Sequence, residues 1–186
     1  MSAILIDGPE AEPVSLAEAK AFLRLEHDDE DGLVAALITA ARLHIEAATR
    51  RLLVTQNWRI VRDRWPGGIV PISLAPLQSI SAVRLFPAEG DAETLPASEY
   101  WLDAASTPAR LVARRGFPSP GRPVAGIEID VVAGYGDAAD VPEPLRQAIR
   151  LLVAHWFEDR LLVGAADLLL PKTVDALIAP YQVLVP

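Results

Sequence analysis

The 186-residue chain has no cysteine and only three histidines. Without cysteine it can form no disulfide, no thiol nucleophile and no thiolate metal site. The absence of disulfides is compatible with a cytoplasmic protein. It also lacks a run of about 18 apolar residues, so we expect no membrane-spanning helix. Its length suits one domain with a sizeable core, or one domain with an elaboration.

Recognisable catalytic and nucleotide-binding motifs are also absent. The sequence has no Gly-rich phosphate loop, no GxSxG nucleophile elbow and no HExxH zinc helix. His155 and Glu158 have the spacing that lets two side chains share a metal on one helix face, yet no motif supplies a third ligand. A surface or interface histidine is the simpler interpretation. We therefore predict that the chain is not an enzyme and has no catalytic residue, no cofactor and no metal site.

The net charge of −8 is concentrated at one end of the sequence. Residues 1–31 hold nine acidic and two basic side chains, whereas residues 58–135 are neutral overall. Such a surface repels the phosphates of nucleic acid, which argues against sequence-specific DNA binding. A protein that lets DNA slide past without holding it is compatible with this charge.

The acidic run at residues 28–31 allows two interpretations. A calcium loop would spread its ligands over about twelve residues around a central glycine, and that pattern is missing. A helix N-terminus also suits the run, because a capping side chain and first-turn acids complement the macrodipole. We expect the helix start.

Helical patterns occupy both ends of the chain. Ser15 and Glu18 have the spacing of a capping box at the start of a first helix. A second helix is expected over residues 29–51, a third from Pro142, and a short last one over residues 171–179. The apolar stripe expected on the first helix is Leu16, Ala19, Phe22 and Leu23; that on the second is Val34, Leu37, Ile38, Ala41, Ile45, Ala48 and Leu52; that on the third is Leu145, Ala148, Ile149, Leu152, Trp156 and Phe157.

Strand patterns fill the middle of the chain. Short strands are expected at residues 58–65, 69–72, 80–86, 99–102, 110–113 and 127–131. The last of these alternates strictly between apolar and polar residues, which predicts one buried face and one wet face. Gly134 and Gly136 are expected to supply positive φ angles at the turn toward the next helix.

These patterns together predict an α+β fold. We expect a single domain over residues 1–186, built as a helical bundle of two N-terminal and one or two C-terminal helices. A region of short antiparallel β-strands at residues 54–135 is inserted into that bundle. Residues 180–186 are expected to form an extended, apolar C-terminal tail, and such a tail is costly unless it docks on something.

Arginines stand out in the β region. They are Arg59, Arg62, Arg64, Arg110, Arg114, Arg115 and Arg122. One interpretation is a contact with an acidic partner surface, such as the acidic N-terminal end of another copy. The other is that they are ordinary solvated arginines.

A set of segments in a fixed order carries a family resemblance. They are residues 14–25 followed by the acidic run, then 33–51, 55–58, 76–80, 98–103, 133–136 and 141–149. Their order and spacing resemble the phage head–tail connector (adaptor) family, gp6-like and gp8-like, of siphophages and gene transfer agents. The resemblance spans about residues 13–160 and does not separate a phage protein from a gene transfer agent protein.

The resemblance implies a structural role without an active site. Connectors form a ring, usually dodecameric, under the portal protein, and they carry the tail-completion (stopper) protein. DNA leaves through the lumen without sequence-specific binding, and no membrane is involved. The chain is therefore expected at the head–tail junction of a virion or virion-like particle that assembles in the bacterial cytoplasm.

Two surface hypotheses follow from the connector role. Four acidic residues are expected to face the lumen or the arginines of a neighbouring subunit, and a group of tail residues is expected to dock on the portal or a neighbour. The acidic residues are Glu18, Glu26, Asp28 and Asp29, facing Arg59, Arg62 and Arg64; the tail residues are Tyr181, Val183, Leu184 and Val185.

Two other classes of function remain open at this point. A monomeric protein-binding adaptor unrelated to virions, such as a toxin–antitoxin or secretion component, would form no ring. An enzyme of an unfamiliar type would need titratable residues clustered in a pocket, and the sequence offers no obvious cluster.

Overall fold

The computed structural model describes residues 2–158 and 171–183, and it has the expected α+β class. The chain forms two compact units. The β unit comprises the residues up to Pro9 together with Thr55–Tyr135. The helical unit comprises Glu10–Val54 and the described residues from Gly136 onward. The inserted antiparallel β region is therefore confirmed, and the N-terminal segment joins it.

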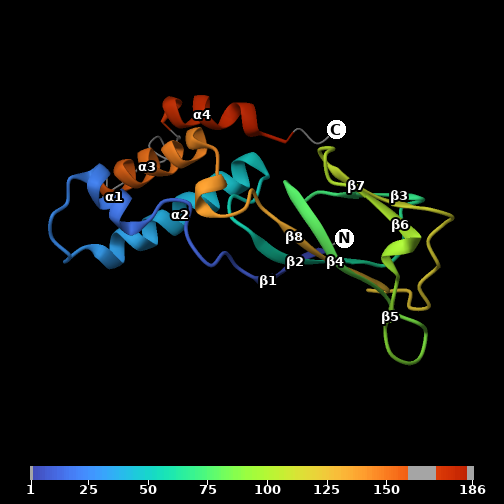
Figure 1. Cartoon of the computed structure of the whole chain (residues 1–186). Helices are drawn as coiled ribbons and strands as arrows, with labels where there is room; N and C mark the ends of the chain where they lie inside the picture. Colours follow the sequence, from blue (N-terminus) through green and yellow to red (C-terminus); the bar gives the residue numbers. More distant parts are fainter. Residues whose placement is uncertain (1, 159–170, 184–186) are drawn as a thin grey trace. The chain divides into compact units, whose positions relative to one another are not determined.

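The helical unit is built around one helix pair, α2 and α3, on which α1 and α4 also pack (Figure 1). Its helices are α1 (Leu16–Leu23), α2 (Asp31–Thr49), α3 (Glu143–Glu158) and α4 (Lys172–Ile178). Short 3-10 turns, η2 (Ala138–Asp140) and η3 (Ala179–Tyr181), precede α3 and follow α4. The sequence also predicts a break at Gly164, after the third helix, and this residue lies outside the described ones.

Local signals explain where α1 and α2 begin. Ser15 and Glu18 form the predicted capping box in full. The first helix ends at Leu23 because Arg24 takes a left-handed conformation with φ of 58°. The expectation of a capping side chain at the start of α2 is wrong, because the N-cap residue Glu30 makes no side-chain capping hydrogen bond. The expected first-turn acid is present, as Asp31.

The second helix is the central core helix of its unit. Val34, Ile38, Ala41 and Ile45 are buried along one stripe, as predicted. By length and composition alone α2 could cross a membrane, which the sequence analysis did not anticipate. Core helices of soluble proteins pass the same test, and this one packs its buried stripe within the helical unit, so the observation is weak evidence for a membrane.

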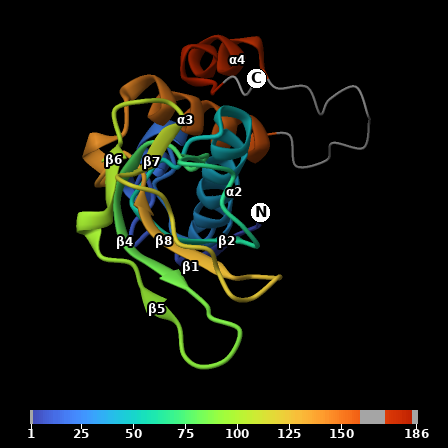
Figure 2. The ribbon, with the colours of Figure 1, turned by 90° about the vertical axis from the view of Figure 1, so that its right-hand side faces the viewer.

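The β unit contains two antiparallel sheets (Figure 2). In spatial order the five-stranded sheet consists of β1 (Ser2–Asp7), β2 (Gln56–Arg62), β8 (Ile127–Ala133), β4 (Leu77–Leu85) and β5 (Glu93–Thr94). The three-stranded sheet consists of β3 (Ile69–Ile72), β7 (Ala109–Ala113) and β6 (Tyr100–Asp103), with a 3-10 turn η1 (Ala97–Glu99) before β6. All six predicted strands are present, β3 with the predicted ends and the other five with shifted ends; β1 and β5 were not predicted.

The middle strand β8 shows the alternation that its sequence predicts. Ile127, Ile129 and Val131 are fully buried, while Glu128 and Asp130 point to the other face. Beyond β8 the chain turns toward η2 through glycines whose φ angles are 129° at Gly134 and 135° at Gly136. A Cβ at Gly136 would lie 2.4 Å from the Asp140 carboxylate, so glycine is required there.

Candidate functional site

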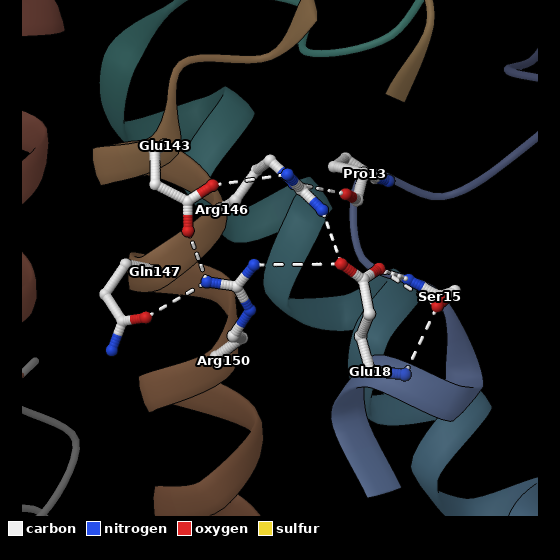
Figure 3. Close-up of polar contacts among 7 residues, drawn as sticks. All are labelled: Pro13, Ser15, Glu18, Glu143, Arg146, Gln147 and Arg150. Atoms are coloured by element: carbon white, nitrogen blue, oxygen red, sulfur yellow. Dashed lines mark hydrogen bonds and ion pairs between the residues drawn. The ribbon is translucent and has the colours of Figure 1, made fainter. Parts of the chain in front are cut away.

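Glu18 links α1 to α3 inside the helical unit (Figure 3). Its Oε2 accepts hydrogen bonds from the Ser15 backbone N–H at 2.8 Å and the Ser15 hydroxyl at 2.9 Å. Its Oε1 accepts from Arg146 Nη2 at 2.5 Å and lies 3.8 Å from Arg150 Nη2. The backbone hydrogen bond of Ser15, helped by both arginines, lowers the pKa of Glu18. Glu18 therefore connects α1 to α3 within the subunit, and its role at a subunit interface or at the lumen stays a prediction.

The same arginines are held on α3 by a second carboxylate. Glu143 accepts from Arg150 Nη1 at 2.6 Å and from Arg146 Nη1 at 3.2 Å, and the Arg150 contact lowers the pKa of Glu143 (Figure 3). Arg146 Nε also donates to the Pro13 carbonyl at 3.0 Å. The positive charge at the start of α3 is therefore balanced within the helical unit.

A second charged group of the helical unit is buried. Arg42 is 6% exposed and donates from Nε to Glu12 at 2.8 Å and from Nη1 to Glu46 at 3.0 Å. Glu46, 9% exposed, also accepts the backbone N–H of Leu53 at 2.9 Å. Buried charges of this kind are tolerated only when each is paired and hydrogen-bonded. This group fixes the chain segment that leaves α2.

The acidic loop, residues 26–31, follows α1, ends at the first residue of α2 and is an exposed charged surface of the helical unit. Lys20 binds Asp28 at 2.5 Å and Asp31 at 2.6 Å, and it lowers the pKa of Asp28. The Asp28 and Asp29 side chains are nevertheless 88% and 93% exposed. Glu26 is exposed as well. Three of the four predicted acidic interface residues therefore lie on one accessible loop.

The β unit carries a ladder of four charges across its central strands β2, β8 and β4. Arg59 donates to Asp130 at 2.7 Å and 3.1 Å, and Arg84 donates to Asp130 at 2.6 Å. Glu128 lies 3.4 Å from Arg59 and 3.6 Å from Arg84. The bond to Asp130 raises the pKa of Arg59. Arg59 is thus occupied within its own sheet.

The other two predicted arginines differ from Arg59 and from each other. Arg62 is partly buried, which lowers its pKa, and its Nη2 donates to the Pro71 carbonyl at 2.9 Å. Arg64 is exposed and has no carboxylate partner in the described part of the chain. The three arginines that the sequence suggested as one group therefore do not form one surface, and only Arg64 is free for a partner.

The outer face of the three-stranded sheet is a surface that the sequence analysis did not single out. Ile69, Val112 and Trp101 are paired in register across β3, β7 and β6 and so form one row on one face. Ile69 is 53% exposed and Trp101 is 51% exposed. The Arg114 guanidinium lies 4.5 Å from the Trp101 ring centroid, a cation–π contact. The sequence signal that could have predicted this face is the alternation along residues 109–113, which places Arg110 and Val112 on the side of the strand opposite to the buried Leu111.

The C-terminal residues are held against the end of α2. Arg51 Nε donates to the Tyr181 carbonyl at 2.7 Å, and the Val183 N–H donates to the Thr49 carbonyl at 3.0 Å. In place of extended backbone from residue 180, Ala179–Tyr181 form the turn η3. Leu184 and Val185 lie outside the described residues. Docking of these four residues on a partner stays a prediction.

Two further surface features belong to the β unit. Strand β1 forms an edge of the five-stranded sheet, and its Ile4, Leu5 and Ile6 are exposed. A pocket of about 320 Å³ lies between the segments 85–88, 93–96 and 118–121. Glu93 is its one titratable lining residue, so this pocket lacks the partnered groups that acid–base catalysis uses. Across residues 2–158 and 171–183, no three carboxylate or histidine side chains gather as a metal site requires.

Comparison with known proteins finds one matching family model and several similar solved chains. The family model of the phage gp6-like head-tail connector protein matches residues 13–82. A chain from the neck of an empty gene transfer agent particle, computed with C6 symmetry, is 28% identical with a TM-score of 0.84; the match covers 100% of this chain and 97% of that chain. No curated protein matches this chain.

Two further solved chains give the same result. One from the virion of a native gene transfer agent particle is 25% identical, with a TM-score of 0.84. One from the neck of a native particle computed with C12 symmetry is 27% identical, with a TM-score of 0.76. Each match covers 100% of this chain and 97% of the other chain. Residues 13–82 thus match the phage gp6-like head-tail connector family, and the whole chain is similar to these neck and virion chains of gene transfer agent particles.

Proposed function

We propose that this protein is a structural connector that assembles into a ring at the head–tail junction of a virion or virion-like particle. The observation that carries the proposal is the likeness to neck chains of gene transfer agent particles, which covers 100% of this chain with a TM-score of 0.84. The connector family match over residues 13–82 supports it independently. The sequence-based expectation of a structural head–tail connector is thereby confirmed, and no observation favours the monomeric adaptor.

The ring is proposed to be dodecameric and to join the portal protein to the tail-completion protein. The C12 symmetry of one similar neck supports the ring number. The portal protein and the tail-completion protein are proposed as partners because a connector lies between them. DNA would pass through the lumen, and the net charge of −8 suits passage without tight binding because it repels phosphate. The exposed Glu26, Asp28 and Asp29 remain candidates for the lumen or a neighbour, and the tail residues remain candidates for the portal.

The role that we propose is assembly and not catalysis. The charged groups described above are ion pairs that tie elements together: Glu18 joins α1 to α3, and Arg59 joins β2 to β8. The exposed features are apolar side chains and charges of the kind that protein interfaces use.

Deleting the gene in its host is expected to leave DNA-filled heads without tails. The physical reason is that a portal without its connector offers no surface for the next tail protein. Electron microscopy of purified particles measures the outcome, and expression of the wild-type chain from a plasmid is the control that should restore tails. Normal tailed particles in the deletion strain would remove the connector proposal and favour an adaptor unrelated to virions.

A further inference from the structure

We propose that the outer face of the three-stranded sheet, here named the tryptophan face (Ile69, Trp101, Val112 and Arg114), binds the acidic loop of a second copy of this chain. The inference rests on the proposed ring, and it names the two surfaces that would meet in each contact between neighbours. One surface lies on the β unit and the other on the helical unit, so every copy carries both.

The tryptophan face has the make-up of an interface centre. An exposed tryptophan beside an exposed isoleucine is costly in water, and Trp and Arg are the residues that most often dominate binding energy. Trp101 and Ile69 stand in the same row, on either side of Val112, while the inner face of the same sheet, with Val70, is buried. The outer row is therefore apolar surface that the fold itself does not use.

Arg114 gives this face a positive charge that nothing in its surroundings neutralises. The neighbouring Arg110 is bound to Asp103 at 2.5 Å, a contact that lowers the pKa of Asp103 to about 2. Arg114 instead stacks on Trp101, and no carboxylate contacts it among residues 2–158 and 171–183. A cation over an indole ring still attracts a carboxylate, because the ring does not cancel its charge. The face thus calls for an acidic partner with some apolar surface.

The acidic loop of the helical unit fits that description. Asp29 is almost fully exposed, and its carboxylate lies 3.8 Å from Nδ1 of the His27 ring. Phe22, on α1 before the loop, is 41% exposed, and Leu33, on α2 after it, is 39% exposed. The acidic loop therefore combines negative charge with exposed apolar side chains, whereas the tryptophan face combines positive charge with exposed apolar side chains. The two surfaces are complementary. Charge complementarity of this kind fixes partner choice and register.

A second copy is the occupant that best accounts for both surfaces. In a ring every contact is heterologous, so each subunit must present two different and complementary faces. The similar neck chains come from particles with C6 and C12 symmetry, which is the arrangement that needs such a pair. If the tryptophan face and the acidic loop each bound DNA or a different protein, nothing would explain why the two surfaces are complementary to each other.

The test uses two charge reversals in the strain that lacks the gene. Arg114→Glu and Asp29→Arg are each expected to lower the yield of tailed particles at least tenfold, because each brings like charges together in every contact. Producing both variants in one cell is expected to restore the yield. In an alternating ring, Glu at position 114 of one copy meets Arg at position 29 of the next, and the wild-type pair forms at the following contact.

Two controls and one further variant make the outcome specific. Thermal melting of the purified variants should match the wild type, since both side chains are exposed. Arg122→Glu, which removes a similar arginine stacked 4.6 Å from the Phe86 ring, should complement the deletion fully. Trp101→Ala should lower the yield at least tenfold without rescue by either reversal.

Each other outcome overturns the inference in a recognisable way. If both reversals fail singly and their mixture fails too, the surfaces bind other proteins and not each other. If only Arg114→Glu is defective, the tryptophan face meets another partner, such as DNA or a tail protein. If either reversal complements alone, the contact does not exist. A deletion strain with normal tails would overturn the connector proposal itself, which separates the two failures.

Discussion

Replacing Glu46 with alanine is expected to lower the free energy of unfolding by about 3–4 kcal/mol. The change removes the carboxylate that binds the buried Arg42 at 3.0 Å and leaves the buried N–H of Leu53 without its acceptor at 2.9 Å. Arg42 keeps one partner, Glu12, so the loss is that of half a buried ion network. Denaturant unfolding followed by circular dichroism measures the change.

A matched control is Glu10→Ala in the same unit, because Glu10 is exposed and should change stability by no more than about 0.5 kcal/mol. A loss below about 1 kcal/mol for Glu46→Ala would mean that Arg42 is solvated as a surface ion pair is, and would contradict the buried network.

Reversing the charge of Arg59 is expected to lower the free energy of unfolding of the β unit by about 2–4 kcal/mol. This loss is expected in the isolated subunit, independently of any effect on assembly. Arg59→Glu places a third carboxylate beside Asp130 and Glu128, which now lie 2.7 Å and 3.4 Å from the guanidinium. Only Arg84 would remain to balance them. Arg64→Glu is the matched control, because Arg64 is exposed and its reversal should leave stability within about 0.5 kcal/mol.

The effect of Arg59→Glu should depend on pH in a defined direction. Burial acts to raise the pKa of Asp130, but the bonds from Arg59 and Arg84 outweigh it, and the pKa is lowered from 3.8. A lowered pKa contributes stability that is fully present above 3.8 and is lost as the pH falls through the folded value. The gap in stability between wild type and variant should therefore narrow in acid. A gap that is constant from neutral pH to acid would contradict the charge ladder.

Local patterns in the sequence were sufficient for most elements of the fold. The capping box at Ser15, the buried stripe of α2 and the alternation of β8 depend on residues close together in the chain, and all are present. Strand β1 was missed because an exposed edge strand has no alternation to reveal it; it is defined by its pairing with β2, about fifty residues away.

The candidate surfaces were harder to predict, because pairing decides which charges are free. Sequence gives Arg59 and Arg64 the same appearance, yet register places Arg59 opposite Asp130 and leaves Arg64 without a strand partner. Trp101 looked like an ordinary strand residue, and only the register of β6, β7 and β3 shows that it shares an exposed row with Ile69. Phe22 was expected in the buried stripe of α1, but this expectation is wrong: its side chain is exposed, and Ala19 is the one buried residue of that helix.

The most direct test of the connector role is the position of this chain in the particle. Purified particles labelled with gold-coupled antibody against the chain should carry the gold at the junction of head and tail, and nowhere else. Particles made without the chain provide the background. Label on the capsid surface or at the tail tip, or no label on particles whose neck is accessible to the antibody, would contradict the proposed connector role.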